Sequence, residues 1–423
     1  MQGGLTRREA IAVGVGAVGA GVAGTGRVRG QPSDTVTVAT RNCYLGGNLF
    51  RLLTAAMEGS EAVRTAASDL LRAVDRSHVP ERMDAIAGEI GRTAPDLVGV
   101  QEAALIRTGE PTSGTTPTAT TVRYDFRERL STALEDRGLP YRVVAAVTTT
   151  DVQLPTTVDG ERRAVRLTDR DLVLAHEDVT TADVTTGRFD TAVSLSNDGR
   201  TVSVERGYGI VDAMVGDTRL TLCNTHLESA STELRLQQAA ELETLLAAHR
   251  DPVVLVGDLN SGPGGSRGAY DRLLETLRDA ASGVGNTCCH AAGLRNDEAS
   301  LTARIDHVLV RGALGPTDVT RVGADPASRI SVDGDRLWPS DHVGVVATLS
   351  PDAAPTATPS TPVETVGPTP TERPAPTPTR TETGTSVSAD PDTTVEVPGF
   401  GAVTGTVAVL AAALAVRRRA EDD

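Results

Sequence analysis

Lysine is missing from this chain of 423 residues, so each of its 41 basic side chains is an arginine. The 56 aspartates and glutamates outnumber them and bring the formal net charge to -15. This balance predicts a strongly acidic surface, which favours solubility in concentrated salt and disfavours a polyanionic substrate. Near-molar salt would shorten the Debye length to about 3 Å, so a nucleic-acid substrate stays open in such a medium.

Aromatic residues and cysteines are also scarce. At 2% of the sequence, aromatic side chains offer no platform on which nucleic-acid bases could stack. The cysteines are Cys43, Cys223, Cys288 and Cys289, and they lack the CxxC spacing of a zinc site. An oxidising compartment would allow a disulfide among them, but the spacing leaves the pairing open.

The first 30 residues have the layout of an export signal. Arg7 and Arg8 precede a mildly apolar, glycine-rich stretch over residues 10–23, which is the order found in twin-arginine signal peptides. The twin-arginine translocase exports folded proteins, so it would be a transient partner of this chain. A disordered basic tail is the alternative interpretation of residues 1–30.

Two further segments follow residue 350. Residues 351–397 are rich in proline, threonine and acidic residues, which predicts a disordered, extended stalk without a core. In residues 398–423, Pro398-Gly399-Phe400 precedes an apolar run that ends in three arginines at 417–419. The run is short for a bilayer span, which needs about 20 residues, and the arginines predict a cytoplasmic end.

This C-terminal segment resembles the PGF-type archaeal sorting signal, in which an archaeosortase replaces the helix with a lipid anchor. The resemblance implies a cell-surface protein of a halophilic archaeon, with its main domain outside the cell. The acidic, lysine-free composition is consistent with that origin. An ordinary C-terminal membrane helix is the alternative, and it would leave the domain facing outward as well.

Residues 31–350 remain for the folded domain, and their apolar runs predict ten strands. The runs cover residues 36–40, 97–100, 141–147, 172–175, 202–204, 210–215, 220–224, 253–256, 305–310 and 343–349. Amphipathic patterns predict helices over residues 49–76, after Pro80, over 124–136, after Ser231 and over 268–281. Ten strands are too many for one flat sheet, and helices are available for the outer faces. We therefore expect an α/β fold, a four-layer α/β/β/α sandwich.

Short polar motifs close most of these apolar runs. In chain order they are Arg41-Asn42, Gln101-Glu102, Asn224-Thr225-His226, Gly257-Asp258-Leu259-Asn260, Arg304-Ile305-Asp306-His307 and Ser340-Asp341-His342. Strand ends are where α/β sheets place chemistry. The carboxylates and carboxamides supply oxygen ligands for a hard divalent cation, and the imidazoles supply donors for an oxyanion. The motifs therefore predict phosphoryl-transfer chemistry.

From Asn42 to His342 the chain resembles the endonuclease/exonuclease/phosphatase superfamily, which includes DNase I-like nucleases, neutral sphingomyelinases and inositol polyphosphate phosphatases. The most specific motifs are Gly-Asp-Leu-Asn, Asn-Thr-His-Leu and Ser-Asp-His, supported by Ile-Asp-His and Gln-Glu. The resemblance implies the four-layer fold, with a site between loops at the top of the two sheets. Arg41 departs from the pattern, because family members often carry tryptophan there, and it leaves the hydrophobic support of Asn42 open.

The resemblance also implies a metal site and a polar support for it. Glu102 would be the principal ligand of Mg²⁺, or alternatively Mn²⁺, with Asn42 in or next to the coordination shell. Asp341 would bind the metal or orient a neighbour, and Asn224 would steady the site and the bound substrate. A surface carboxylate at a strand end is the alternative interpretation of Glu102.

Catalytic roles follow from the same resemblance. Asp258 would orient or deprotonate the attacking water, and Asn260 would hydrogen-bond this water or the phosphate. His342 would donate to a non-bridging phosphate oxygen, with its tautomer fixed by Asp306. His226 would be the second donor, to the phosphate or to the leaving oxygen.

We therefore expect an extracellular, metal-dependent phosphoric ester hydrolase in which water attacks in line without a covalent intermediate. Its partner would be a phosphate ester in a nucleic acid, in a phospholipid as for sphingomyelinases, or in a small molecule. We expect the chain to act as a monomer. A noncatalytic surface module, which uses the groove only to bind, is the alternative.

Overall fold

The computed structural model describes residues 35–111, 116–197 and 200–353. The predicted signal peptide and C-terminal segment lie outside the described residues, as does the predicted stalk beyond its first three residues. Those three residues, Pro351–Ala353, form a short 3-10 helix, η2. No helix in these ranges is both long enough and apolar enough to cross a membrane.

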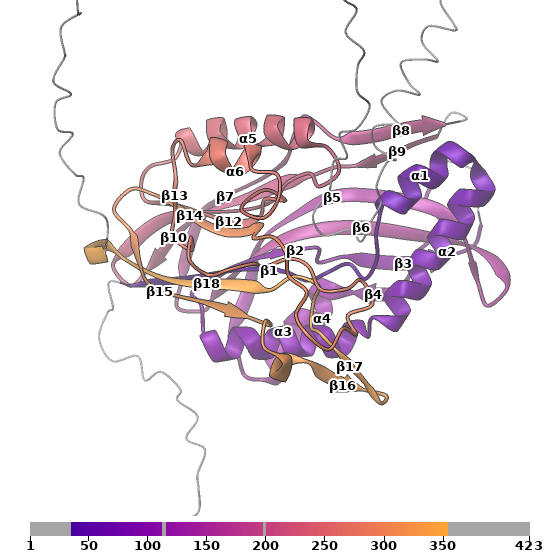
Figure 1. Ribbon diagram of the computed structural model, residues 1–423, viewed down its shortest axis with the longest axis horizontal. Helices are drawn as coiled ribbons and strands as arrows, with labels where there is room; N and C mark the ends of the chain where they lie inside the picture. The colour runs from indigo at the N-terminus through magenta and orange to yellow at the C-terminus, as the bar shows by residue number, and fades with distance from the viewer. Residues whose placement is uncertain (1–34, 112–115, 198–199, 354–423) are drawn as a thin grey trace, which may run out of the picture. The chain divides into compact units, whose positions relative to one another are not determined.

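Two large sheets form the inner layers (Figure 1). The eight-stranded sheet has the order β15-β18-β1-β2-β6-β3-β4, with β5 also paired to β6. Its strands are β1 (Val36–Asn42), β2 (Leu97–Gln101), β3 (Leu105–Gly109), β4 (Thr121–Asp125), β5 (Tyr141–Val158), β6 (Glu161–His176), β15 (Gly315–Val322) and β18 (Gly344–Ser350).

The six-stranded sheet has the order β13-β14-β12-β11-β10-β7. Its strands are β7 (Thr180–Arg188), β10 (Gly207–Val215), β11 (Thr218–His226), β12 (Val253–Asp258), β13 (Arg278–Asp279) and β14 (Asp306–Arg311). Two separate hairpins pair β8 (Val193–Asn197) with β9 (Arg200–Val204), and β16 (Ile330–Val332) with β17 (Asp335–Leu337).

Helices cover the outer face of each sheet. Helices α1 (Phe50–Glu58), α2 (Ser60–Arg76), α3 (Val79–Thr93) and α4 (Phe126–Asp136) share one apolar cluster with the eight-stranded sheet. Helices α5 (Thr232–Ala247) and α6 (Gly268–Leu273) share another with the six-stranded sheet. A short 3-10 helix, η1, covers Pro326–Ser328. Figure 1 shows α5 and α6 on one side of the sheets and α3 and α4 on the other, which confirms the predicted α/β/β/α sandwich.

The sheets pack face to face through small and branched apolar side chains. Val38 and Leu97 from one sheet and Leu222 and Val254 from the other belong to one buried cluster between them. Gly99 allows a close approach of the two sheets, because a Cβ there would lie 2.5 Å from the Val256 side chain. The narrow spacing brings the polar ends of the central strands of both sheets to one place.

Local sequence explains several helix ends. The Asp125 carboxylate accepts the Glu128 N–H at 3.2 Å and begins α4, and the Ser231 hydroxyl accepts the Leu234 N–H at 3.3 Å and begins α5. Side chains of these types satisfy the N–H groups that an initial helical turn leaves unpaired. Pro80 lies in the first turn of α3, where a missing N–H has no cost.

All ten predicted strands are present, and two helix predictions differ from the structure. The predicted helix over residues 49–76 is two helices, which meet at Gly59 with a φ of 117°. The helix predicted over residues 268–281 is wrong beyond Leu273. The following residues turn away because the Asp279 side chain accepts hydrogen bonds from Tyr270 and Arg304, and β13 pairs with β14.

The pattern of apolar runs also underestimated the length of two strands and the number of strands. The predicted runs 141–147 and 172–175 are parts of one long hairpin, β5 with β6, whose remaining residues include many threonines and charged side chains. Strands β3, β4, β7, β8, β13, β15, β16 and β17 were not predicted at all. Apolar runs mark the buried central strands, whereas all the missed strands except β3 lie at sheet edges or in the separate hairpins.

Candidate active site

The ends of five central strands meet at one rim of the paired sheets. In the parallel pair of β1 and β2, Asn42 lies opposite Gln101, directly before Glu102. In the other sheet, Asp258 on β12 lies opposite both His226 on β11 and Asp306 on β14. The register therefore aligns groups that lie far apart in sequence.

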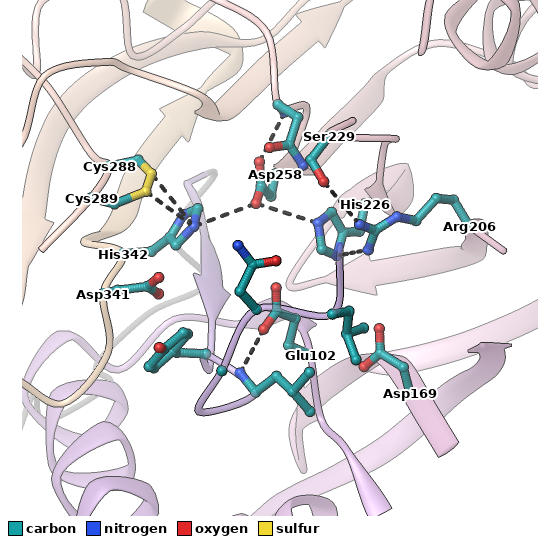
Figure 2. Close-up of a pocket in the computed structure, with 16 residues that line it drawn as sticks. Glu102, Asp169, Arg206, His226, Ser229, Asp258, Cys288, Cys289, Asp341 and His342 are labelled. Atoms are coloured by element: carbon teal, nitrogen blue, oxygen red, sulfur yellow. Dashed lines mark hydrogen bonds and ion pairs between the residues drawn. A yellow bond between two sulfur atoms is a disulfide. The ribbon is translucent and has the colours of Figure 1, made fainter. Parts of the chain in front are cut away.

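These groups surround one pocket (Figure 2). Its lining residues are Tyr44, Leu45, Gly47, Asn48, Leu49, Glu102, Asp169, Arg206, His226, Ser229, Asp258, Asn260, Cys288, Cys289, Asp341 and His342. Figure 2 shows His226 and Arg206 on one side, His342 and Asp341 on the other, and Asp258 between them. Of the nine residues predicted for the site, six line this pocket.

Glu102 follows the last residue of β2 and has a φ of 58°, a left-handed conformation that only a few per cent of non-glycine residues adopt. Its carboxylate accepts the Asn42 amide N–H at 3.3 Å and the Leu45 backbone N–H. Its own backbone N–H donates to Asp171. These contacts hold the acidic side chain toward the pocket. The strain lies in the backbone of Glu102, and backbone strain of this kind clusters at functional sites.

Asn42 is buried beside the pocket and connects the two sheets. Its amide nitrogen donates to Glu102 and, at 3.1 Å, to Asp258 on the opposite sheet. Its amide oxygen accepts the Tyr44 backbone N–H at 2.8 Å. In this orientation Asn42 presents donors, not its oxygen, to the two carboxylates.

Asp258 lies at the centre of the pocket among nitrogen donors. One oxygen accepts the Asn260 backbone N–H at 2.9 Å, and the other accepts from Asn42. The Nε2 atoms of His226 and His342 lie 3.5 and 3.7 Å from the same second oxygen. The Asn260 amide donates to the Leu227 carbonyl, which fixes its side chain at the rim.

His342 is paired with a buried carboxylate. Its Nδ1 lies 2.9 Å from the Asp306 carboxylate. Burial alone would lower the pKa of His342, but the carboxylates of Asp306, Asp258 and Asp341 outweigh it and raise the pKa well above the usual value. The three carboxylates therefore favour the imidazolium form of His342, which carries an N–H on both ring nitrogens.

His226 has the opposite environment. Its Nδ1 lies 3.0 Å from a guanidinium nitrogen of Arg206, which also donates to the Ser229 hydroxyl at 3.4 Å. Burial, then the positive charges of Arg206 and His342, lower the pKa of His226 well below its usual value. The pKa values of the two imidazoles in this pocket are thus shifted in opposite directions.

The pocket contains more negative charge than its own cations balance. The pKa values of Asp169, Asp258 and Asp341 are all raised to about 7, with burial as the largest cause in each case. One carboxylate oxygen of Asp341 is buried and has no hydrogen-bond partner among the described residues. Since a buried carboxylate is costly unless paired, this set fits a hard divalent cation held by oxygen ligands.

Two groups among the described residues have the spacing of metal ligands. Ligand atoms of Asp258, Asp306 and His342 lie within 4.8 Å of one another, and so do those of Cys288, Cys289 and His342. The His342–Asp306 hydrogen bond accounts for the first group. The cysteines of the second are joined to each other by a disulfide, while Cys43 and Cys223 are free and buried.

Two predicted residues lie behind the pocket. Asp306 does not line the pocket but binds the His342 ring from behind, as expected for a partner that orients this ring. Asn224 is buried between the sheets, where its amide donates to the carbonyls of Val100 and Leu172 and its oxygen accepts from Gln101 at 2.6 Å. All its groups are thus used by the protein, so the geometry gives Asn224 a role in joining the sheets and no free group for a substrate.

Arg41 takes the place of an apolar support. It is 2% exposed, and its guanidinium pairs with the buried Glu89 carboxylate at 2.9 Å. It also donates to the His342 carbonyl, while the Ser340 hydroxyl donates to the Asn42 carbonyl at 2.8 Å. The support of this strand end is therefore ionic and links it to the Ser-Asp-His motif.

Sequence reasoning missed several pocket residues. Asp169 lies in the charged run Asp169-Arg170-Asp171, and Arg206 lies between Glu205 and Gly207, so neither charge stood out and neither received a role. Ser229, which is separated from the Asn-Thr-His-Leu motif by one residue, also received no role. The Cys288–Cys289 disulfide lies 3.7 and 3.8 Å, by its two sulfurs, from Nε2 of His342, and no sequence signal places it there.

Comparison with known proteins shows the family to which the chain belongs. A model of the Endonuclease/Exonuclease/phosphatase family matches residues 71–342. A solved structure of a member of that family from Bacteroides thetaiotaomicron is 16% identical, with 75% of this chain and 98% of that chain covered and a TM-score of 0.46. A mannosyl-6-phosphatase from the same organism is 17% identical, with 74% and 99% covered and a TM-score of 0.45. TDP2 from D. rerio, complexed with a single strand DNA product, is 14% identical, with 75% and 100% covered and a TM-score of 0.44. No curated protein matches the chain.

Proposed function

Since the chain belongs to the endonuclease/exonuclease/phosphatase family, we propose that it is a Mg²⁺-dependent phosphoesterase, which cleaves a phosphodiester or phosphomonoester by in-line attack of water. The observation that carries the proposal is the convergence of Glu102, Asp258 and His342 on one pocket. These are a carboxylate suited to a metal, a carboxylate suited to water and an imidazole suited to phosphate.

The Glu102 and Asp341 carboxylates would hold the cation, with Asn42 beside them. The partnerless oxygen of Asp341 and its raised pKa, about 7, support this assignment, because a cation would offset both. When bound, such a cation polarises a phosphate oxygen and offsets the developing negative charge. A site with few carboxylates, and with room for water and phosphate oxygens, favours Mg²⁺. Mn²⁺ would suit the same ligands.

The protein's own groups would then position the water and the phosphate. Asp258 is held by the Asn42 amide and the Asn260 backbone N–H, so its carboxylate can orient the attacking water and take its proton. His342, charged and fixed by Asp306, would donate an N–H to a non-bridging phosphate oxygen. Without a nucleophilic side chain in this scheme, no covalent intermediate forms.

We also propose an extracellular location for this activity. The twin-arginine pattern and the PGF-type tail support export by the twin-arginine translocase and anchoring by an archaeosortase. The negative net charge of -15 supports a medium of high salt. Detection of the protein at the surface of intact cells, and its loss when both segments are deleted, would test this location.

The substrate is best addressed by direct comparison in high salt. Plasmid DNA, RNA, a sphingomyelin-type lipid, a sugar phosphate and bis-nitrophenyl phosphate should be tested with Mg²⁺, with Mn²⁺ and with a chelator. We expect hydrolysis of at least one of them, lost with chelator and in Glu102→Ala and His342→Ala. Arg142→Met on β5 serves as a matched control. The Arg142 guanidinium donates to the backbone carbonyls of His176 and Val179. Full activity of both site variants would refute the mechanism, and inactivity on every substrate would favour the noncatalytic module.

A further inference from the structure

Arg206 is a buried arginine in the pocket wall with no role in the scheme above. It directly precedes β10 and is 6% exposed. Figure 2 shows its guanidinium turned toward His226 and Ser229. The nearest atoms are Nδ1 of His226 at 3.0 Å and the Ser229 hydroxyl at 3.4 Å.

The chemistry of the two groups decides where the His226 proton lies. A guanidinium has five N–H donors and no acceptor, so the ring nitrogen that faces it must accept. Nδ1 of His226 therefore carries no proton, and the single proton of the neutral ring lies on Nε2. That nitrogen faces the pocket, 3.5 Å from the Asp258 carboxylate.

Arg206 is itself held as a cation by buried carboxylates. Its Nε lies 3.7 Å from the Glu228 carboxylate, which is 0% exposed. Burial lowers the pKa of Arg206, but Glu228, Asp169, Glu102 and Asp171 outweigh it and raise the pKa above the ordinary value. The guanidinium thus stays charged and donor-only next to His226.

We propose that Arg206 is a positioning residue, which holds His226 in the neutral tautomer with its proton on Nε2. His226 then presents one fixed N–H donor to the pocket and does not transfer a proton. His342 has a carboxylate behind its Nδ1, so its partner has the opposite charge to the partner of His226. The catalytic meaning of this arrangement rests on the proposed phosphoesterase function, but the tautomer itself does not.

The tautomer can be measured on the wild-type protein without an activity assay. Histidine labelled with ¹⁵N gives separate NMR signals for protonated and unprotonated ring nitrogens, and the His226 signals are assigned by their loss in His226→Ala. We expect an unprotonated Nδ1 and a protonated Nε2 at neutral pH. A proton on Nδ1 of His226, in either the other tautomer or the imidazolium, would overturn the proposal.

Variants test what the tautomer does. Arg206→Met keeps the length of the side chain without a donor, and it should lower kcat by about 10- to 100-fold with KM little changed. Arg206→Lys retains a donor-only group and should recover part of this loss and the wild-type tautomer. If Arg206 acts through His226, Arg206→Met combined with His226→Ala should be no slower than His226→Ala alone. Additive losses, or a wild-type tautomer in Arg206→Met, would refute the positioning role.

Failure of this proposal and failure of the proposed function are distinguishable. If no phosphate ester is hydrolysed but Nδ1 of His226 is unprotonated, the tautomer assignment stands and the enzymatic function fails. If esters are hydrolysed but Nδ1 of His226 is protonated, the function stands and the role of Arg206 fails. Arg142→Met controls for the loss of an arginine elsewhere on the domain and should keep wild-type kinetics and the wild-type His226 signals.

Discussion

Replacing Arg41 with methionine should destabilise the fold strongly, because this arginine neutralises a carboxylate inside the protein. Arg41 and Glu89 are each 2% exposed, and two guanidinium nitrogens lie 2.9 and 3.3 Å from the Glu89 oxygens. Removal of one partner of a buried pair leaves an uncompensated charge and typically costs about 3–5 kcal/mol. We expect a loss of that size in Arg41→Met, measured by urea unfolding at equilibrium.

The loss should depend on pH in a defined direction. Burial raises the pKa of Glu89, and Arg41 opposes this effect. Without Arg41 the folded protein favours the protonated carboxyl even more, while the unfolded chain releases that proton above about pH 4.3. The stability of Arg41→Met should therefore be highest at low pH and fall as the pH rises, more steeply than in the wild type.

Two further variants make the result decisive. Arg72 and Asp69 form an exposed pair on α2, so Arg72→Met should change stability by no more than about 0.5 kcal/mol. Adding Glu89→Leu to Arg41→Met removes the stranded charge and should recover most of the loss, since apolar replacement of a buried pair is often neutral or stabilising. A loss below about 1 kcal/mol in Arg41→Met, or no recovery in the double variant, would refute the reasoning.

Three other predictions concern the pocket and its support. Asp306→Asn should lower kcat by up to about 10⁴-fold with little change in the unfolding midpoint, because His342 loses the partner that stabilises its charge and fixes its ring orientation; unaltered kinetics would argue against that role. The pKa of Asp258 and of Asp341 is about 7 in the folded protein against an ordinary value near 4. Without a divalent cation, stability should therefore be lost as the pH rises from about 4 through 7, and added Mg²⁺ should raise the melting temperature at pH 8 more than at pH 5; an equal rise at both would contradict the assignment. Asn224→Ala should lower the free energy of unfolding by about 1–3 kcal/mol with KM unchanged, since the Asn224 amide donates to two carbonyls of the opposite sheet. A raised KM with full stability would instead support a role of Asn224 in substrate binding.

Much of the candidate site was visible in the sequence because its residues end buried strands. Glu102 directly follows one buried strand, and Asp258 is the last residue of another. Apolar runs predict such central strands from local sequence alone. The order of the motifs then indicated a family and, with it, a common rim. The structure brings these residues together at contact distance, as in the 3.1 Å hydrogen bond from Asn42 to Asp258, 216 residues away.

Other pocket residues could not be assigned in this way. Asp169 lies in the polar part of β6, where the strand itself was not predicted, and Arg206 lies between two strands. Neither belongs to a motif with a characteristic spacing. Their side chains become informative only when a partner is known, and the partner of Arg206 is a ring on the neighbouring strand, 20 residues away.

The sequence by itself determined the central strands, most helices, the acidic charge and the identity of the polar groups at the strand ends, since these depend on composition and on periodicities within short segments. The family resemblance already implied the carboxylate behind His342, and only the tertiary structure decided that a guanidinium stands behind His226. The physical reason is that protonation depends on burial and on neighbours within a few ångströms, and packing of the two sheets creates both.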